Sequence, residues 1–389
     1  MSGVGSHIRN SGCRSLHTVR TLRWTGRRYH GRMRAPIFLL IVGCAGVARA
    51  QTRDSGARIE RVTDGVYAIT HENATEEWPH GNTGVVIGPD DVLVIDAGYL
   101  PSRAKADIAL IRSVTSKPVR WLVMSHWHFD HNNGNSAYRD AWPGVTIVSE
   151  RDTREWIELN STWWSRMTTA PGSAKRVALE KLEEQLKTGT DSAGRRISSE
   201  QRTALEDNIR RRRGELQELA ALKVVPPNLV FDGELTLWLG NRRVELRAQG
   251  RANSPNDVTV YLPEDRVLFT GDIVVQDPLP YVGMSWPVPW ADVLRRVEGI
   301  PVAALVPGHG PVMKDHAYTR KVRELLEAAT ARVDSMARTG LTLDQIQAAI
   351  SLDDVRRSFA PWAGAPEADW KYTVTALVER AWRGVRGQG

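Results

Sequence analysis

Apolar and polar residues alternate along the first half of the chain in a pattern that predicts short strands. Residues 59–62 and 66–69 flank a Thr-Asp-Gly turn, and residues 81–88 and 92–95 flank a Pro-Asp-Asp turn, so each pair predicts a β-hairpin. Residues 101–114 follow with the period of an amphipathic helix. Strands followed by a helix predict the first half of a layered α/β fold.

A second set of strands is predicted in the second half of the chain. The apolar runs that predict it are residues 235–239, 244–246, 258–262, 267–269 and 302–306. Helical patterns follow at residues 318–338, 343–350 and 369–383. Thr342 and Gln345 form a capping box at the start of the second of these helices. Two sets of strands with flanking helices predict two sheets packed face to face under helices.

The region from about residue 150 to 225 separates the two halves and is predicted to be helical. Apolar residues recur there at helical spacing in two groups, Leu179, Leu182 and Leu186, and then Leu205, Ile209, Leu216 and Leu219. Ser198 and Gln201 form a capping box before the second group. We therefore expect a helical hairpin inserted over the fold.

Two features of this insertion bear on function. Trp156, Trp163 and Trp164 either provide apolar contacts for a substrate beneath a roof, or attach the insertion to the body of the protein. The basic run Arg210 to Arg213 is predicted to be a solvated helix face.

The start of the chain has the anatomy of a leader. A charged stretch, a short apolar run and an A-x-A cleavage site ending at Ala50 predict a secretory signal peptide at about residues 33–50. The apolar run is too short to span a bilayer as a helix. The true start is either Met1 or Met33. We expect the mature protein to be exported, to the periplasm or outside the cell.

Composition and charge fit a globular protein. The chain has 389 residues, of which 41% are hydrophobic and 25% are charged, enough for a large core. We expect a leader at residues 1–50, a main folded domain at 51–315 and a C-terminal helical extension at 316–389 packed on the core. The net charge of +7 comes from nine arginines in the leader, without which it is −2. A nucleic-acid partner is therefore not expected.

Both cysteines, Cys13 and Cys44, lie in the leader. The mature domain therefore has no disulfide and no cysteine metal ligand. Residues 41–44 resemble a bacterial lipoprotein cleavage box, in which case Cys44 would be acylated and would anchor the chain. A membrane partner is expected only in that case.

Candidate metal ligands follow the strand predicted at residues 119–124. His126 and His128 are two positions apart at a strand end, so they project to the same side and can bind one ion. Asp130 and His131 follow in the turn and can face a second ion. Two divalent ions about 3.5–4 Å apart can polarise a carbonyl group and activate water.

This stretch resembles the HxHxDH motif of the metallo-β-lactamase superfamily. Residues 93–98 resemble the family's early strand that ends in an aspartate, residues 268–272 the strand with its bridging aspartate, and residues 306–310 the loop with its last histidine. The resemblance spans roughly residues 59–315. It implies a four-layer αββα sandwich, here with an inserted helical hairpin and C-terminal helices.

The resemblance also implies roles for individual residues. Asp130 is expected to orient the nucleophile as well as bind metal, and Asp96 either supports the metal loop or caps a turn. The implied metal ligands are His126, His128, Asp130, His131, Asp272 and His309.

Asn253 departs from the family pattern. Residues 250–257 align with Gly-x-x-His-Thr-x-Gly-Asp, so Asn253 stands where the third histidine of the first metal site belongs. An amide oxygen is a weaker zinc ligand than imidazole, so we expect the second site to be tighter. Asn253 is either a weak ligand at the catalytic centre or a turn residue. Of the unassigned histidines, His80 could reach the centre.

Tyr281 is a candidate catalytic residue outside the metal motif. It lies in a segment, residues 278–290, that is predicted to be a rigid aromatic loop. Tyr281 would either donate a hydrogen bond to the substrate or serve only in packing.

The sequence thus predicts an exported zinc hydrolase with one or two zinc ions per chain. A metal-activated hydroxide would attack an amide, lactam, ester or thioester carbonyl of a small molecule, as in thiol-free metallo-β-lactamases. One alternative is a glyoxalase II-like thioesterase. Another is an iron-dependent enzyme of the persulfide dioxygenase type, because His and Asp ligands also suit iron. A third is a non-catalytic periplasmic binding protein, if Asn253 leaves the first site empty.

Overall fold

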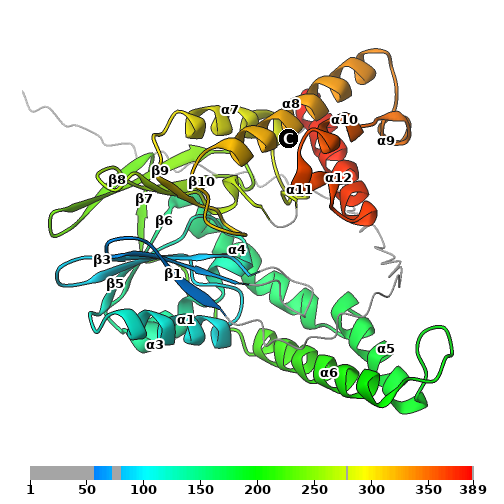
Figure 1. The fold of residues 1–389 in the computed structure, drawn as a ribbon, viewed down its shortest axis with the longest axis horizontal. Coiled ribbons are helices and arrows are strands. Elements are labelled where there is room, and N and C mark those ends of the chain that lie inside the picture. Colours follow the sequence, from blue (N-terminus) through cyan, green and yellow to red (C-terminus); the bar gives the residue numbers. More distant parts are fainter. Residues whose placement is uncertain (1–56, 72–79, 277–278, 388–389) are drawn as a thin grey trace, which may run out of the picture. The chain divides into compact units, whose positions relative to one another are not determined.

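The computed structural model of the protein describes residues 57–71, 80–276 and 279–387 (Figure 1). The predicted signal peptide, its cleavage site at Ala50 and the lipidation candidate Cys44 lie outside these residues. No helix within the described ranges is long and apolar enough to cross a membrane.

The first sheet is built from strands between residues 58 and 231. Its strands lie in sequence order, antiparallel from β1 to β4 and parallel from β4 to β7. They are β1 (Arg58–Thr63), β2 (Val66–Thr70), β3 (Thr83–Ile87), β4 (Val92–Ile95), β5 (Val119–Val123), β6 (Thr146–Glu150) and β7 (Leu229–Phe231).

The second sheet is formed by the later strands of the chain, and the main core lies between the two sheets. Apolar side chains such as Leu93 and Ile95 on one sheet pack with Leu246, Val260 and Phe269 on the other. The strand order is β12-β11-β10-β9-β8. The strands are β8 (Glu234–Leu239), β9 (Arg242–Gly250), β10 (Asp257–Leu262), β11 (Val267–Phe269) and β12 (Ala304–Val306).

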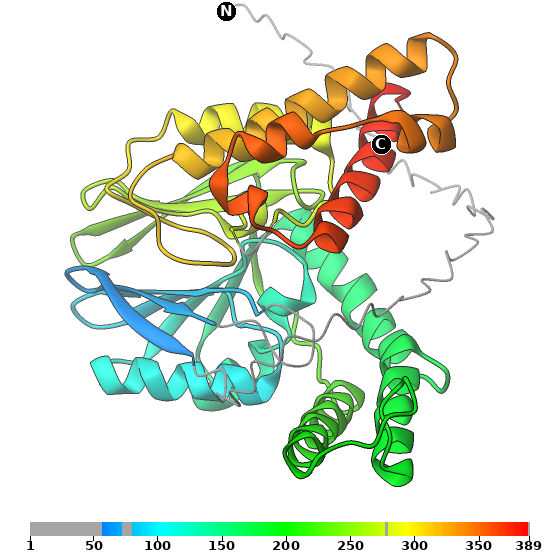
Figure 2. The same cartoon turned by 45° about the vertical axis from the view of Figure 1, so that its right-hand side comes forward.

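Helices cover the outer face of each sheet, as Figures 1 and 2 show. Ile108 and Ile111 of α1 (Pro101–Val114) pack against Leu122 and Ile147 of the first sheet, where α3 (Asn135–Ala141) also lies. On the second sheet, α7 (Pro287–Glu298) and α8 (Ala317–Arg338) form the outer layer, and α12 (Glu367–Val385) packs on these two helices. The predicted four-layer αββα sandwich is therefore confirmed.

The remaining short helices lie in the segments between these elements. They are α2 (Phe129–Asn132), the 3₁₀ helix η1 (Gly271–Ile273), α9 (Leu343–Ala349), α10 (Asp353–Arg357) and α11 (Ala360–Ala363). Both predicted capping boxes are present, at Ser198 and at Thr342.

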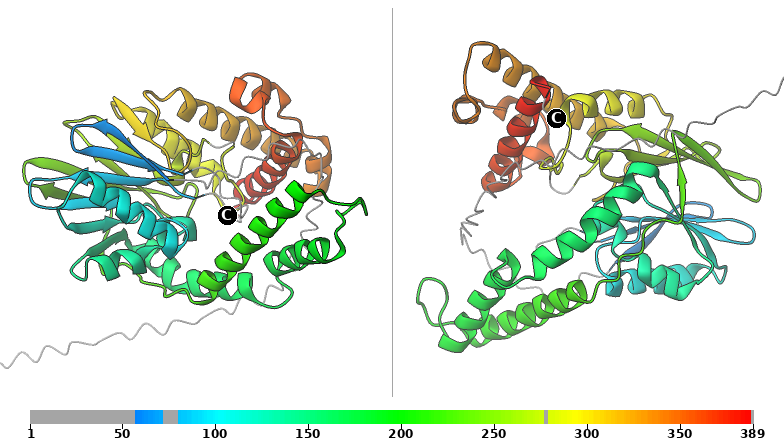
Figure 3. Two further views of the ribbon diagram at one scale, coloured as in Figure 1. Left: turned by 60° about the horizontal axis from the view of Figure 1, so that its bottom comes forward. Right: turned by 180° about the vertical axis from the view of Figure 1, so that it is seen from behind.

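The insertion differs from the predicted hairpin because it contains three helices, α4 (Arg151–Thr169), α5 (Ala174–Thr188) and α6 (Ser199–Ala220). Helices α5 and α6 form the expected hairpin. Helix α4 lacks a leucine pattern, because the face that it buries is made of Thr153, Ile157, Ser161 and Ser165. Figure 3 shows α4 running outward from the sheets to meet the other two helices.

Two further predictions were wrong in part. The basic run of α6 is not wholly solvated, because Arg212 is buried and donates to Asn208 Oδ1 at 2.9 Å. The segment predicted as an aromatic loop becomes helical from Pro287, where α7 begins. Proline is tolerated in the first turn of a helix because the N–H groups there have no helical partner.

Gly134, in the loop after the metal motif, is expected to be intolerant of a side chain. A Cβ atom there would overlap the carbonyl oxygen of Ala97 and lie 2.6 Å from Cβ of Ala104. We expect Gly134→Ala to lower the free energy of unfolding by about 3 kcal/mol, at the upper end of overpacking costs. Urea unfolding measures this. Gly144→Ala is the matched control, since a Cβ there meets no atom within 4 Å. Equal stability of the two variants would contradict the prediction.

Candidate metal centre

The predicted metal ligands come together at one edge of the two sheets. His126 and His128 follow β5, and Asp130 and His131 lie in α2. From the second sheet, Asp272 lies in η1 after β11 and His309 in the loop after β12. All six side chains are buried, and their ligand atoms form two groups with Asp272 in common.

The first group contains His126, His128 and Asp272. Nε2 of His126 lies 2.9 Å from Nδ1 of His128 and 3.6 Å from Oδ2 of Asp272. Among the described residues, no fourth histidine, cysteine or carboxylate joins this group. This group therefore has fewer candidate ligands than the second group.

The second group contains Asp130, His131, Asp272 and His309. Nε2 of His309 lies 3.1 Å from Oδ2 of Asp130 and 3.4 Å from Oδ1 of Asp272. Nε2 of His131 lies 3.2 Å from the same Oδ1 atom. The two carboxylate oxygens of Asp272 therefore face different groups, as a bridging ligand requires.

The arrangement fits a bound cation. Nε2 atoms of His131 and His309 lie 3.3 Å apart, and when both neutral rings carry their proton on Nδ1 the lone pairs of these atoms face each other. The buried Oδ1 atom of Asp272 has no hydrogen-bond donor. A divalent ion held by these nitrogen and carboxylate atoms would satisfy both, and nitrogen and oxygen ligands suit zinc or iron.

The charges of the centre are matched to a cation. Burial lowers the pKa of His131, but the negative charges of Asp272, Asp130 and Asp96 outweigh burial and raise this pKa well above its usual value. The pKa of His309 is also raised by Asp272 and Asp130 against the effect of burial. The carboxylates thus favour positive charge at the positions where a metal would replace protons.

Asp96 orients ligands of both groups. Its Oδ2 atom lies 2.8 Å from Nδ1 of His131 and accepts the hydroxyl proton of Ser125 at 2.7 Å. Oγ of Ser125 lies 2.9 Å from Nδ1 of His126. Each histidine can therefore keep its proton on Nδ1 and direct Nε2 to a metal, as hydrogen-bonded partners of ligands do. The supporting role of Asp96 is favoured over the turn-capping role.

Two residues near the centre were not singled out from the sequence. Ser125 could have been noted, because it directly precedes the motif and follows a buried strand. Asn82 links the first sheet to the loop that carries His309, since its side chain donates to the carbonyl oxygens of Pro307 and Gly310 at 3.0 and 2.8 Å. Its partners are more than 200 positions away, so no local pattern reveals them.

Asn253 is fully buried beside the loop that contains Tyr281. Its Nδ2 atom donates to the backbone oxygen of Tyr281 at 2.7 Å, and its Oδ1 atom has no described partner. The Tyr281 ring lies 6.1 Å from that of His128, and burial raises the pKa of its hydroxyl above the usual value, with Tyr372 adding to this effect. Tyr281 is thus held as a protonated side chain near the first group. His80 is not a member of either ligand group.

The tryptophans of α4 divide between the two predicted roles. Trp164 attaches the insertion to the body, because its ring stacks on Phe129 at 3.6 Å and contacts Tyr99 at 5.8 Å. Trp156 and Trp163 are 36% and 58% exposed, so they are available for other contacts.

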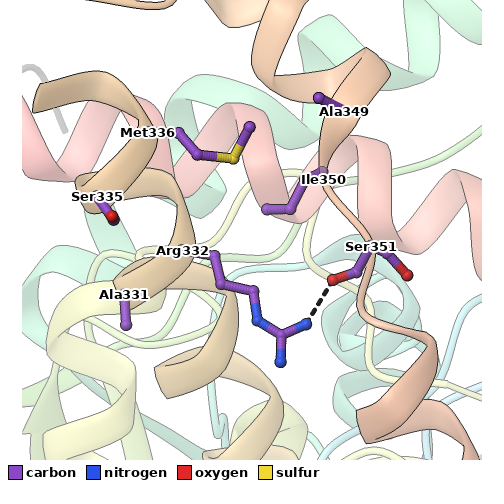
Figure 4. Close-up of a pocket in the computed structure, with 7 residues that line it drawn as sticks. All are labelled: Ala331, Arg332, Ser335, Met336, Ala349, Ile350 and Ser351. Carbon is purple, nitrogen blue, oxygen red and sulfur yellow. Dashed lines mark hydrogen bonds between the residues drawn. The ribbon is translucent and has the colours of Figure 1, made fainter. Parts of the chain in front are cut away.

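A pocket elsewhere in the molecule contains none of these residues. It lies between α8 and α9 and the segment that follows, and Figure 4 shows its lining. Arg332 in this pocket is already paired with Asp354 at 2.6 Å. The pocket is therefore separate from the candidate chemistry.

Comparison with known proteins identifies the class. The model of the metallo-β-lactamase superfamily matches residues 77–330, and the chain belongs to this family. This confirms the family resemblance drawn from the sequence.

Individual relatives are distant. A linear primary-alkylsulfatase from Pseudomonas sp. (strain ATCC 19151) is 22% identical over 308 residues, which cover 76% of this chain and 54% of that protein. The chain thus spans about half the length of this relative. A stereoselective inverting sec-alkylsulfatase from Pseudomonas sp. is similar in structure, with a TM-score of 0.56, 16% identity and coverage of 84% of this chain and 50% of that one. A metallo-β-lactamase from Pontibacter korlensis has a TM-score of 0.50 and 17% identity over 70% of this chain and 99% of its own.

Replacing Asn253 by histidine is expected to strengthen metal binding at the first group. The change supplies an imidazole where the family pattern has one, and imidazole is a better zinc ligand than an amide oxygen. We expect Asn253→His to hold two zinc ions per chain at zinc concentrations that leave the first group of the wild type partly empty. Metal analysis after equilibrium dialysis measures this. If the number of zinc ions per chain were unchanged at every zinc concentration, this prediction would be wrong. Asn256→His, on the same loop, is the control.

Proposed function

We propose that the protein is an exported zinc enzyme that hydrolyses esters of small amphiphilic molecules, with sulfate esters as the first class to test. The observation that carries hydrolysis is the pair of buried ligand groups that share Asp272. Zinc bound there would supply a Lewis acid and an activated water. The alkylsulfatase relatives suggest the sulfate ester, and the predicted signal peptide suggests export to the periplasm or beyond.

An apolar stripe on α4 supports an amphiphilic substrate. Trp127 contacts His128 with ring centroids 4.7 Å apart and contacts Trp156 at 5.2 Å. From Trp156 the stripe continues along one face of the helix through Leu159, Trp163 and Met167, which are 55–72% exposed. Exposed apolar surface of this extent is typical of binding sites. An alkyl chain lying on it would place its polar end next to the metal ligands.

The protein's own residues would position the reacting groups. Asp130 lies beside His309 in the second group, with its Oδ2 atom 3.1 Å from Nε2 of that ring, and would orient a water molecule there. Tyr281, which stays protonated, is a donor near the first group.

The test is a substrate panel with the zinc-loaded protein. It contains alkyl sulfates of increasing chain length, a β-lactam, a thioester and, after iron loading, a glutathione persulfide. We expect turnover of the sulfates, with KM falling as the chain lengthens. Trp163→Ala should raise KM for long chains but not for short ones, whereas Trp238→Ala, equally exposed on β8, should change neither.

Other outcomes identify different functions. Turnover of the β-lactam or thioester alone would replace the sulfate proposal with the carbonyl hydrolysis expected from the sequence. If only the iron-loaded protein reacted, consuming oxygen with the persulfide, the proposal of a zinc enzyme would be overturned. No turnover of any substrate would overturn hydrolysis of these classes.

A further inference from the structure

The loop that carries Tyr281 contacts the candidate metal centre and folds into a tight turn. The ring of Tyr281 lies 6.1 Å from that of His128, a member of the first ligand group. The backbone N–H and the hydroxyl of Ser285 both donate to the carbonyl oxygen of Val282, at 3.3 and 2.8 Å, and close the turn. A Cβ at Gly283 would lie 2.9 Å from the hydroxyl oxygen of Tyr281. This hydroxyl therefore lies over the turn.

Arg380 of the C-terminal helix α12 binds the same turn. Its Nε atom donates to the carbonyl oxygen of Ser285 at 2.5 Å, and its guanidinium lies 5.2 Å from the centre of the Trp286 ring. The guanidinium of Arg251 lies 5.7 Å from the centre of that ring. The guanidinium of Arg380 and the hydroxyl of Tyr281 are thus held at one turn, beside the first ligand group.

The charge of Arg380 is not neutralised by a carboxylate. Within the described part of the chain, only Nε of this partly buried guanidinium has a hydrogen-bond partner, and no carboxylate pairs with it. The neighbouring carboxylate, Glu379, is paired with Arg383 at 2.7 Å. Other partly buried arginines have carboxylate partners, as in the pairs Arg242–Asp265 and Arg323–Glu298. Arg380 is therefore a fixed cation without a counter-ion.

The electrostatics of Arg380 agree with this description. Burial lowers its pKa, and the charge of Arg383 adds to this effect. Arg380 in turn opposes the effect of burial on Tyr281, since a positive charge close to the hydroxyl lowers the pKa that burial raises. The two groups are therefore within electrostatic range of each other.

Two hydroxyl groups at this place also lack an acceptor. Neither the hydroxyl of Tyr281 nor that of Tyr372 has a hydrogen-bond partner among the described residues. Tyr372 lies about two turns before Arg380 on α12 and is 48% exposed. An arginine and hydroxyl donors without a carboxylate among them are a set that suits the oxygens of an anion.

We propose that Arg380 and the hydroxyl of Tyr281 form a subsite for the oxyanion of a small-molecule ligand, beside the first ligand group. The free N–H groups of the guanidinium would donate to oxygens of a sulfate or carboxylate, and the hydroxyl would donate to another. The subsite deepens the proposed hydrolysis of sulfate esters and rests on it for the identity of the ligand. Binding of an oxyanion there requires no turnover.

The first test measures binding of octane-1-sulfonate to the zinc-loaded protein by calorimetry. This probe has an oxyanion and an alkyl chain but no ester bond. We expect Arg380→Gln to raise its Kd about tenfold, the effect of a lost hydrogen bond to a charged group. The Kd of 1-octanol, which has the same chain without the charge, should not change. The glutamine amide nitrogen is as many bonds from the backbone as Nε of arginine, so it can still donate to Ser285.

Three further variants define the groups that bind the anion. Arg380→Lys keeps the charge without the planar fork and should recover part of the affinity. Tyr281→Phe removes only a hydroxyl and should raise the Kd of the sulfonate about threefold. Arg383→Gln, one turn along α12 and paired with Glu379, is the control and should bind both probes as the wild type does.

The outcomes separate anion binding from support of the loop. If Arg380→Gln bound the sulfonate as tightly as the wild type, Arg380 would only support the turn and the subsite would be overturned. An equal loss of affinity for sulfonate and octanol would overturn it too, because a displaced loop and not a lost charge would be the cause. No effect of Tyr281→Phe would remove the hydroxyl from the subsite.

A kinetic test rests on the proposed hydrolysis. We expect Arg380→Gln to raise KM for alkyl sulfates about tenfold, since the lost hydrogen bond is the same. An unchanged KM would overturn the role of Arg380 toward this substrate. If the wild type bound the sulfonate through Arg380 but hydrolysed no sulfate ester, only the proposed function would be overturned.

Discussion

Asp272→Ala is expected to lower the metal content of the protein to one ion or none per chain. The change removes a carboxylate that faces both groups. Among the described residues it leaves His126 and His128 in the first group and Asp130, His131 and His309 in the second. Loss of a residue that merely orients a ligand costs about 10–100-fold in affinity, so loss of this shared ligand should cost at least about 100-fold. Metal analysis and zinc titration with a competing chelator measure this.

The control for Asp272→Ala is Asp265→Ala, which removes a carboxylate paired with Arg242 and absent from both ligand groups. It should retain the metal content of the wild type. If Asp272→Ala bound two ions as tightly as the wild type, the bridging role assigned to this carboxylate would be wrong.

The second prediction concerns Asp96, which should affect stability as well as metal binding. Asp96→Ala leaves three buried donors without an acceptor, the N–H and O–H of Ser125 and the Nδ1–H of His131. Each unpaired buried donor costs about 1–3 kcal/mol, so we expect a loss of at least about 3 kcal/mol in the free energy of unfolding. Zinc affinity should fall by about 10–100-fold.

Asp96→Asn separates the effect of the lost hydrogen-bond acceptors on stability from the effect of the lost charge on zinc affinity. The backbone of Asp96 has a φ of 64°, in the left-handed region that asparagine tolerates better than alanine. Asparagine also keeps one acceptor oxygen. We therefore expect a smaller loss of stability than for alanine, but a similar loss of zinc affinity, because the amide N–H₂ opposes the proton of one partner. Equal zinc affinity in Asp96→Asn and the wild type would show that the charge of Asp96 does not matter.

The sequence predicted the layers because strands and helices depend on local patterns. Strand alternation, the helix at residues 101–114 and two capping boxes are each contained in a few neighbouring residues. The six candidate ligands came from the HxHxDH stretch and from the resemblance of residues 268–272 and 306–310 to the family pattern, and the structure brings their side chains together.

Features that depend on distant parts of the chain were not predictable in this way. Helix α4 buries Thr153 and Ser161 against the body, so its inner face does not look apolar. Arg212 is buried in a helical run of arginines that resembles a solvated face. The hydrogen bond between His71 and Asp107 joins a strand end to a helix 36 positions away, and neither residue belongs to a recognisable motif.

The position of Asp96 determines how substitutions at this centre affect the two ligand groups. Because one carboxylate steadies His131 directly and His126 through Ser125, a substitution there alters both metal positions at once. Mutations in the two groups should therefore show strong epistasis. A form of the protein that binds metal at one group alone would be reached more readily by changing His128, which does not depend on Asp96 in the described structure, than by changing either histidine that does.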